Sequence, residues 1–341
     1  MSVVQKPRIN DIARTAKVSA ATVSRVLHNH ANVNPETRQA VQAAIRELNY
    51  VPNKWQFGSA NNKLIGVMVS DIRNPFFSDL IYLLQEQFMT QGYAVVPFNN
   101  EFDCAREKQL LQVVKQQRLA ALVLVSAMDN DNLRQALSGL TCPVTLIDRV
   151  VEDFSGSVVI QDNFQAGYIA TKYLVDLGYH EIAFLAGDVT STSSNARVEG
   201  YRKALSNAFL TVNESLIMRG KMGIDRGYRD GLAYLERLEE LPRALLMAND
   251  MTAIGFIEAC KERNIRIPED ISIVSFDGIA LSGIKSVNLT TVRQPIEEMT
   301  QKICELTVAA IQDPDSVQHS RVFLEPTLII RGSACENMHT K

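Results

Sequence analysis

The stretch from Asn10 to Arg25, NDIARTAKVSAATVSR, contains two short amphipathic segments separated by a tight turn. The apolar residues of each segment recur at helical spacing: Ile12, Ala13 and Ala16 in the first, and Val23, Val26 and Leu27 in the second. Ser19 follows the turn and can cap the second helix. The opposite face of that helix is small at its start and basic further along, with Ala20, Ala21, Ser24, Arg25 and His28. This pattern predicts a helix-turn-helix whose second helix enters a DNA major groove.

A third helix is predicted to begin after Asn34, at Pro35, and to bury Val41, Ala44, Ile45 and Leu48. Three such helices could form an ordinary surface bundle, but the charge distribution favours DNA. Residues 1–60 contain eight Lys and Arg against three Asp and Glu, a net charge of +5, whereas the whole chain carries −3. A basic head on an acidic body is the charge pattern of a protein that binds phosphates.

Two longer motifs extend this interpretation. The run D-I-A-x-x-A-x-V-S-x-x-T-V-S-R-V-L begins at Asp11, and x-T-R-x-x-V-x-x-A-I-x-E-L-x-Y-x-P-N ends at Asn53. With Ile-Ile-Arg-Gly-Ser at 329–333, they resemble the LacI/GalR (lactose-repressor) family of bacterial transcription regulators over nearly the entire chain. The resemblance implies a regulator, expected to be a repressor, whose affinity for operator DNA is controlled by a small molecule. Two heads must engage a pseudo-palindromic site, so a homodimer is expected, and a tetramer is possible.

The resemblance places the two main specificity positions at Ala20 and Ala21, whose small side chains favour thymine methyl groups. Arg25 is the best candidate to read a guanine. Lys17 stands in the turn at a position where the family commonly has Gly. Its side chain is either tolerated there or adds a contact to a DNA phosphate. Phosphate donors are Ser19, Thr22 and Ser24, and the predicted DNA-binding set also includes Arg8, His28 and Asn32.

Residues 53–63, NKWQFGSANNK, have the composition of a linker between head and body. In the family this segment forms a hinge helix on DNA, and a Leu from it wedges into the minor groove. Here the usual Ala-Arg-x-Leu is absent, and Phe57 falls in the Leu position. Phe57 is therefore a candidate for the side chain that wedges into the minor groove, and Trp55 could assist it. The alternative is a disordered linker whose aromatic residues pack on the body.

The body, residues 64–341, alternates near-continuous apolar strands with amphipathic helices. This pattern predicts an α/β body of doubly wound parallel sheets, and the number of strands suggests two lobes. By resemblance the lobes are like those of a periplasmic sugar-binding protein. The predicted domains are a helix-turn-helix head at 1–52, a linker at 53–63, and an effector-binding and dimerisation body at 64–341. The N-lobe is expected at about 64–162 plus 294–320, and the C-lobe at 163–293 plus 321–335, with one last strand at 322–331.

Polar residues follow the apolar strands repeatedly, and ligands bind at the carboxyl ends of parallel strands. Each single Asp could instead be a cap or turn residue, and Asp250 is expected to be a helix cap. By resemblance the effector site comprises Phe76, Phe77, Ser126, Asp148, Asp162, Arg197, Met222, Asn249, Asp277 and Gln294. Arg197 could otherwise form a salt bridge with Glu199 or a neighbouring helix, and the two Phe could belong to the core. Met222 stands at a position where the family often has an aromatic residue that stacks on a ring of the ligand. The identity of the ligand is therefore open: a sugar is expected, and a nucleoside or purine is the alternative.

Other functional classes receive less support. The chain has no Gly-rich phosphate loop, no G-x-S-x-G, and no metal-ligand spacing, so we expect no enzyme activity, no cofactor and no metal. The five cysteines are scattered, as is typical of reduced thiols. A transport or receptor protein without a DNA role is disfavoured by the basic head and by the absence of a signal peptide. We therefore expect a cytoplasmic protein that does not contact a membrane.

Overall fold

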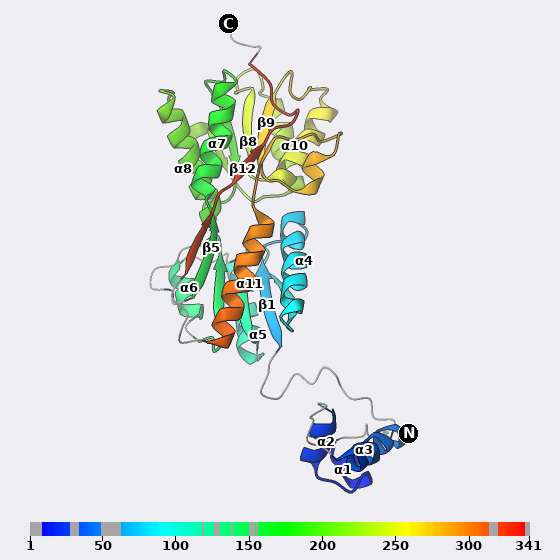
Figure 1. Cartoon of the computed structure of the whole chain (residues 1–341). Helices are drawn as coiled ribbons and strands as arrows, with labels where there is room; N and C mark the ends of the chain where they lie inside the picture. The colour runs from blue at the N-terminus through cyan, green and yellow to red at the C-terminus, as the bar shows by residue number, and fades with distance from the viewer. Residues whose placement is uncertain are drawn as a thin grey trace. The chain divides into compact units, whose positions relative to one another are not determined.

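The computed structural model describes residues 9–27, 34–48, 63–117, 119–125, 130–137, 139–149, 154, 156–313 and 320–337. The chain divides into two compact units, Met1–Ala60 and Asn61–Lys341, which are the head and the body (Figure 1).

The described residues of the head form three helices, α1 (Ile9–Thr15), α2 (Ala20–Leu27) and α3 (Pro35–Glu47). Their apolar faces meet as the sequence predicts, in a cluster of Ile12, Ala13, Val23, Val26, Val41 and Ala44. Ser19 begins α2, because its Oγ accepts the Thr22 backbone N–H at 3.1 Å. Asn34 begins α3 in the same way, since its Oδ1 accepts the N–H of Glu36 at 3.0 Å. The predicted helix-turn-helix head is confirmed, although the side chain of Leu27 lies outside the described residues.

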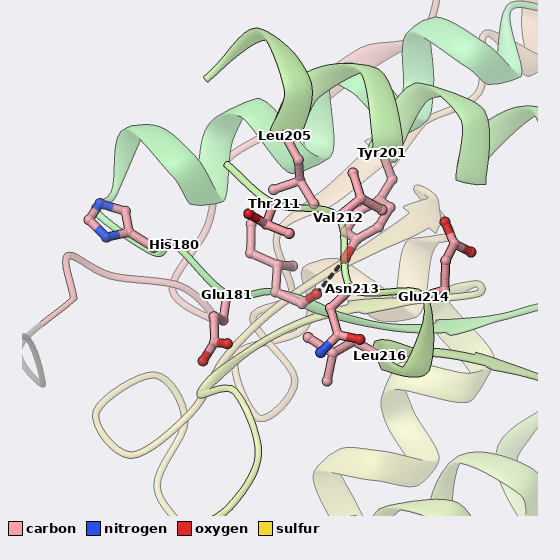
Figure 2. Close-up of a pocket in the computed structure, with 10 residues that line it drawn as sticks. His180, Glu181, Tyr201, Leu205, Thr211, Val212, Asn213, Glu214 and Leu216 are labelled. Atoms are coloured by element: carbon pink, nitrogen blue, oxygen red, sulfur yellow. Dashed lines mark hydrogen bonds between the residues drawn. The ribbon is translucent and has the colours of Figure 1, made fainter. Parts of the chain in front are cut away.

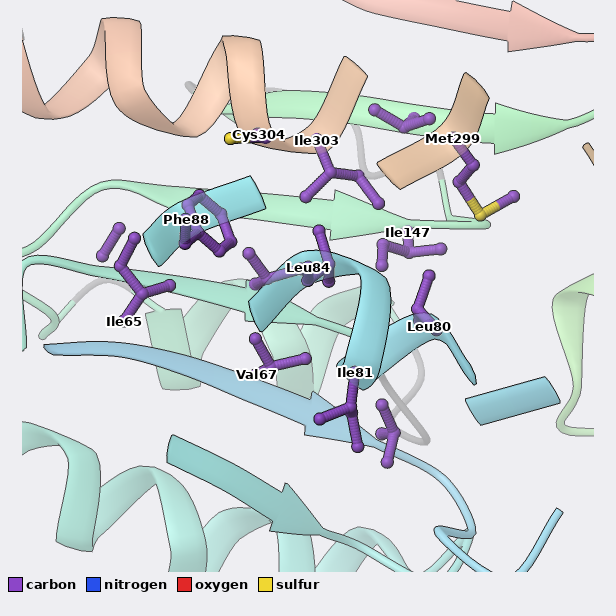
Figure 3. Packing of buried hydrophobic residues seen from close by; sticks show 14 of the residues in the cluster. Ile65, Val67, Leu80, Ile81, Leu84, Phe88, Ile147, Met299, Ile303 and Cys304 are labelled. Carbon is purple, nitrogen blue, oxygen red and sulfur yellow. The ribbon is translucent and has the colours of Figure 1, made fainter. Parts of the chain in front are cut away.

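The N-lobe is built on a six-stranded parallel sheet in the order β11-β5-β4-β3-β1-β2. Its strands are β1 (Leu64–Val69), β2 (Ala94–Asn99), β3 (Ala121–Leu124), β4 (Val144–Ile147), β5 (Ser157–Gln161) and β11 (Arg321–Leu324). One face is covered by α4 (Pro75–Thr90) and α11 (Ile296–Gln312), and Figure 3 shows Leu84 and Ile303 packing there against Val67 and Ile147. The other face is covered by α5 (Cys104–Gln116) and α6 (Asn130–Leu137).

The C-lobe repeats this design with the order β12-β10-β9-β8-β6-β7. Its strands are β6 (Ala183–Ala186), β7 (Ile217–Arg219), β8 (Ala244–Met247), β9 (Ser272–Asp277), β10 (Thr291–Arg293) and β12 (Thr327–Ile329). Only β12 is antiparallel among the pairings of the described strands. The helix pair α7 (Asn163–Asp176) and α8 (Thr192–Asn207) covers one face, and α9 (Ile224–Leu235) with α10 (Asp250–Glu262) covers the other. Two 3-10 helices, η1 (Glu214–Leu216) and η2 (Ala280–Gly283), complete the lobe.

The chain passes between the lobes after β5, after β10 and after β11. One expectation needs correction here, because the single last strand at 322–331 is two strands. β11 pairs with β5 in the N-lobe, and β12 pairs with β10 in the C-lobe. Pro326 lies between them, and proline has no N–H to continue a ladder. The predicted fold class, an α/β body of two doubly wound lobes, is confirmed.

Candidate DNA-binding face and ligand site

The start of α2 presents small and basic side chains to solvent. Lys17, Ser19, Ala20 and Arg25 are all exposed. The Ser19 and Thr22 hydroxyls are hydrogen-bonded at 2.8 Å beside the first backbone N–H groups of α2, where a helix favours a phosphate. The predicted residues Arg8, His28, Asn32 and Phe57 lie outside the described residues, as do the side chains of Ala21 and Ser24. The described part of the face therefore combines hydroxyl groups, which are able to donate to phosphates, with the exposed guanidinium of Arg25.

The turn before α2 explains why glycine is common at position 17. Lys17 has φ of 53°, a left-handed conformation that a side chain disfavours and glycine adopts freely. Its ammonium is not used in an ion pair among the described residues of the head.

Arg197 occupies the centre of a polar cluster between the two lobes, and only 6% of it is exposed. Its Nε donates to Asn163 Oδ1 at 2.9 Å, and its Nη1 donates to the Ala248 carbonyl at 3.0 Å. The guanidinium lies over the Phe276 ring, 4.6 Å from the centroid, and Nη2 is 3.9 Å from Asp277 Oδ1. The alternative pairing with Glu199 is wrong, because the described contacts of the Arg197 guanidinium are with Asn163, the Ala248 carbonyl and Asp277. Glu199 accepts from Arg202.

Arg197 reaches this position because α8 packs very closely against α7. A Cβ added to Gly167 would lie 2.0 Å from the Arg197 carbonyl oxygen, and one added to Gly200 would lie 2.0 Å from the Phe164 carbonyl oxygen. The two glycines therefore let the helix backbones touch. This contact holds Arg197 beside Asn163, the first residue of α7.

Asp277, at the end of β9, connects the lobes and is 7% exposed. Its Oδ1 accepts from Gln294 Nε2 at 2.9 Å, and its Oδ2 accepts from Asn74 Nδ2 at 3.3 Å. Asn74 belongs to the N-lobe, where its Oδ1 also caps α4. Burial raises the pKa of Asp277, while Arg197, Gln294 and Asn74 oppose that rise.

Asp148, at the end of β4, supplies a second carboxylate. Its Oδ1 accepts the Gln161 backbone N–H at 2.9 Å. Burial raises the pKa of Asp148, against the Gln161 hydrogen bond and the charge of Arg197. Asp148 and Asp277 both have positive φ, 54° and 106°. Backbone strain of this kind is typical of functional positions.

Two other predicted residues use their oxygens to begin helices. Asp162 Oδ1 accepts the Gln165 N–H at 2.8 Å and caps α7. Asn249 Oδ1 accepts from Thr252 N at 2.9 Å and caps α10. Asn249 is therefore the cap that the sequence analysis expected of Asp250, and that expectation was wrong. Asp250 is fully buried instead and accepts from the Ser275 hydroxyl, the Thr291 hydroxyl and the Ile279 N–H.

The two predicted aromatic residues of the site, Phe76 and Phe77, are less exposed than expected. Phe76 is 6% exposed and belongs to the N-lobe core, which was the alternative interpretation. Phe77 is half-buried and meets Phe76 edge to face, with ring centroids 5.2 Å apart. Met222 is half-buried beside Gly187, and Ser126 lies outside the described residues.

Two residues of the cluster, Asn74 and Asn163, were not predicted. Asn74 precedes Pro75, a signal of a helix cap, and Asn163 follows Asp162 at the end of a strand. Both signals were local, whereas the role of each residue in the cluster depends on contacts with distant segments.

The cluster offers carboxylate, guanidinium and amide groups around one location. Such groups donate to and accept from hydroxyls, so the arrangement suits a hydroxyl-rich small molecule. Within the described residues, no group of His, Cys, Asp and Glu could hold a metal ion, and no helix could span a membrane.

Comparisons with known proteins agree with this geometry. Residues 8–53 match the model of bacterial regulatory proteins of the lacI family, and residues 171–334 match a periplasmic binding protein-like domain. The transcriptional repressor PurR of Haemophilus influenzae (strain PittEE) is 33% identical, with 95% of this chain and 98% of PurR covered. This chain belongs to the LacI family. It is a DNA-binding transcriptional regulator and not an enzyme.

Two further LacI-family relatives support the assignment. The ribose operon repressor of Escherichia coli (strain K12) is 30% identical, covering 96% of this chain and 99% of that protein. The solved structure of the Lac repressor dimer, bound to operator and an anti-inducer, is 26% identical with a TM-score of 0.80. The match covers 97% of this chain and 100% of the Lac repressor chain. The alternative of a transport receptor without a DNA role is not favoured.

Proposed function

We propose that this chain is a cytoplasmic homodimeric repressor whose operator affinity changes when a sugar or sugar derivative binds between its lobes. The observation that carries the proposal is the buried cluster of Arg197, Asp148 and Asp277 with the amides of Asn74 and Asn163. Two carboxylates and one guanidinium can bind several hydroxyls at once. The name of the ribose operon repressor, a relative of similar length, is in keeping with a sugar ligand.

A nucleoside or purine is the second candidate, and the relative PurR keeps it open. A flat base gains much of its binding energy by stacking on an aromatic side chain. Met222 stands where an aromatic is common, and Phe76 is buried in the core. The composition of the site therefore favours a sugar over a base.

The proposal can be tested by thermal-shift screening of the full chain against pentoses, hexoses, disaccharides, nucleosides and purines. A true ligand in excess raises the melting temperature by mass action, and Asp277→Asn should reduce that shift. If only nucleosides or purines raised the melting temperature, the sugar assignment would be wrong. If no compound of the panel did so, the proposed ligand class would be rejected.

The DNA-binding part is tested by selecting duplexes from a random pool with the full chain. We expect enriched sites to be pseudo-palindromic, with A·T pairs opposite Ala20 and Ala21. Arg25→Ala should cost about 1–3 kcal/mol and relax one base position. An equal loss on random DNA would show that Arg25 contacts only phosphate.

A further inference from the structure

A cavity of about 470 Å³ lies between α5 and α6 of the N-lobe. Its apolar part consists of the buried Leu111 and of Ala105 and Ala136, whose small side chains leave space between the helices. The polar side chains that line it include Lys108, Gln112, Lys115, Asn132 and Gln135. Cavities of this size hold small molecules. None of these residues belongs to the Arg197 cluster, so the cavity is separate from the proposed effector site.

Two lysines give this cavity a positive charge. Lys108 and Lys115 are exposed and lie two turns apart on one face of α5, about 10 Å from each other along the helix axis. Among the described residues neither ammonium is in an ion pair, and none that lines the cavity is acidic. The neighbouring carboxylate of Glu107 is fully buried and accepts from Asn100 instead. The positive charge of the cavity is therefore not offset by its own lining.

The Lys115 side chain extends to the end of α6. A Cβ added to Gly139, shortly after α6 ends at Leu137, would lie 2.7 Å from Lys115 Nζ and 3.1 Å from Lys115 Cε. The glycine therefore leaves room for the ammonium beside α6, whereas Lys108 adds its charge one turn after the start of α5. A molecule in the cavity would meet a cation at two levels, with the amide of Gln112 between them.

A second cavity, of about 500 Å³, lies in the C-lobe at the amino ends of β6 and β7 and has the opposite charge. Glu181 and Glu214 line it, and none of its described lining residues is Lys or Arg. Figure 2 shows these two carboxylates with Asn213 between them. Of these two cavities of similar size, the N-lobe cavity is the one that suits an anion.

We propose that the cavity between α5 and α6 binds a small molecule that carries two or more phosphoryl groups. Lysine binds phosphate as a point charge, whereas the planar fork of arginine matches a carboxylate best, and no Arg is among the described residues that line the cavity. The side-chain amides of Gln112, Asn132 and Gln135 can donate to further phosphate oxygens. Because the two lysines are two turns apart, a ligand with several phosphoryl groups can contact both, and a single phosphate contacts one.

Binding is tested by titrating the full chain with tripolyphosphate at constant ionic strength, and with inorganic phosphate and citrate for comparison. The basic head also attracts polyanions, so the location is read from Cys104, which is exposed and lines the cavity. Bound tripolyphosphate should slow the alkylation of Cys104 by neutral iodoacetamide, and should leave the rate at Cys335, outside the cavity, unchanged. We expect inorganic phosphate and citrate to protect Cys104 roughly tenfold more weakly.

Three variants test the contacts of the anion. Lys108→Gln and Lys115→Gln each remove one cation, and Gln112→Glu puts a carboxylate one turn from Lys108. Each should raise the tripolyphosphate concentration that gives half-maximal protection of Cys104 by roughly tenfold or more. All three positions are exposed, so thermal stability should change little. Lys285→Gln is the matched control, because it makes the same charge change at an exposed position that lines neither cavity, and it should keep full protection.

Two results would overturn the proposal. One is that tripolyphosphate fails to protect Cys104 at any concentration, and the other is that Lys115→Gln and Lys285→Gln protect it equally well. Protection by citrate as strong as that by tripolyphosphate would reject the phosphoryl assignment. None of these results bears on the proposed effector, because the Arg197 cluster shares no residue with this cavity.

Discussion

At the scale of single residues, Arg197 stabilises two buried carboxylates as well as offering a ligand contact. Replacing it with Met would leave Asp148 and Asp277 without their nearby cation. Arg197→Met should therefore destabilise the body by about 3–5 kcal/mol and abolish the effector-induced thermal shift. Urea unfolding and thermal-shift titration of the full chain measure the two effects.

The matched control is Arg202→Met on the same helix. Arg202 pairs with Glu199 and Glu214 at the surface, so its loss should cost no more than about 1 kcal/mol and leave ligand binding intact. If the two variants lost similar amounts of unfolding free energy, the contacts of Arg197 with the buried carboxylates would not be what stabilises the body.

Lys17 combines an unfavourable backbone conformation with an exposed charge. Lys17→Gly should stabilise the turn by about 1 kcal/mol, because glycine adopts φ of 53° without strain. If the ammonium contacts a phosphate, the slope of log affinity against log salt should also fall by about one per head. Hydrogen exchange of the α1 and α2 amides measures the first effect, and DNA binding at several salt concentrations measures the second.

Lys17→Arg serves as the comparison, since it keeps both the charge and the strained backbone. It should reproduce the salt dependence of the unchanged protein. An unaltered salt slope in Lys17→Gly would mean that Lys17 is merely tolerated in the turn.

Asp250 makes stability depend on pH. Burial and the neighbouring Asp277 raise its pKa to about 7, against the hydrogen bonds from Ser275, Thr291 and Ile279. Because the folded state holds this proton more tightly than the unfolded chain, the stabilisation is lost as pH rises through about 7. The free energy of unfolding should fall by up to about 1.4 kcal/mol per pH unit between pH 5 and 7.

Urea unfolding at pH 5, 6, 7 and 8 measures this slope. Asp250→Asn cannot titrate, so its slope should be smaller, with the remainder due to Asp148 and Asp277, whose pKa values are also raised. Stability that rose with pH across this window would contradict the assignment.

At the scale of elements, close helix packing depends on particular glycines. On α9, a Cβ added to Gly227 would lie 1.9 Å from the Thr252 carbonyl oxygen of α10. A Cβ added to Gly231 on the same helix would lie 3.0 Å from the Ala259 side chain and 3.1 Å from the Phe256 side chain, and no closer than 3.5 Å to the backbone of α10. Gly227→Ala should cost about 3 kcal/mol or more because the backbones must separate. Gly231→Ala should be near neutral, since alanine's helix propensity offsets mild crowding.

Thermal unfolding of the full chain compares the two variants directly. Equal destabilisation would show that the α9 and α10 backbones can move apart at little cost.

The elements that could be predicted were those with a local signal. Helical periodicity located α2 and α3, and apolar runs located the strands, because burial of one face or of both leaves a regular pattern. Pro326 gave a local reason for the break between β11 and β12, but their assignment to different sheets depends on long-range pairing. Similarly, Asp250 and Asn249 are adjacent, and sequence alone did not tell which one caps α10.

At the scale of the whole body, contacts among the described residues join the two lobes around the polar cluster. Asn74 donates to Asp277, Thr192 donates to the Asp148 carbonyl at 3.2 Å, and Ile279 packs into the N-lobe core. The sequence could not predict these pairs, because they join residues that are distant in the sequence and meet only where the two lobes touch. A ligand that contacts Asp148 and Asp277 must therefore act on both lobes at once.

This arrangement predicts that affinity for the effector and coupling to DNA can be separated. Asn74→Ser keeps a side chain that can cap α4 but removes the amide that reaches Asp277. Losing one hydrogen bond worth about 1 kcal/mol should reduce the effector-induced change in operator affinity roughly fivefold. Asp162→Ser instead keeps a side chain that can cap α7 within the C-lobe but removes a carboxylate of the predicted effector site, so it should weaken effector binding and leave the coupling factor unchanged. Operator titrations with and without saturating effector measure both, and equal coupling factors in the two variants would show that the signal does not pass through the Asn74–Asp277 contact.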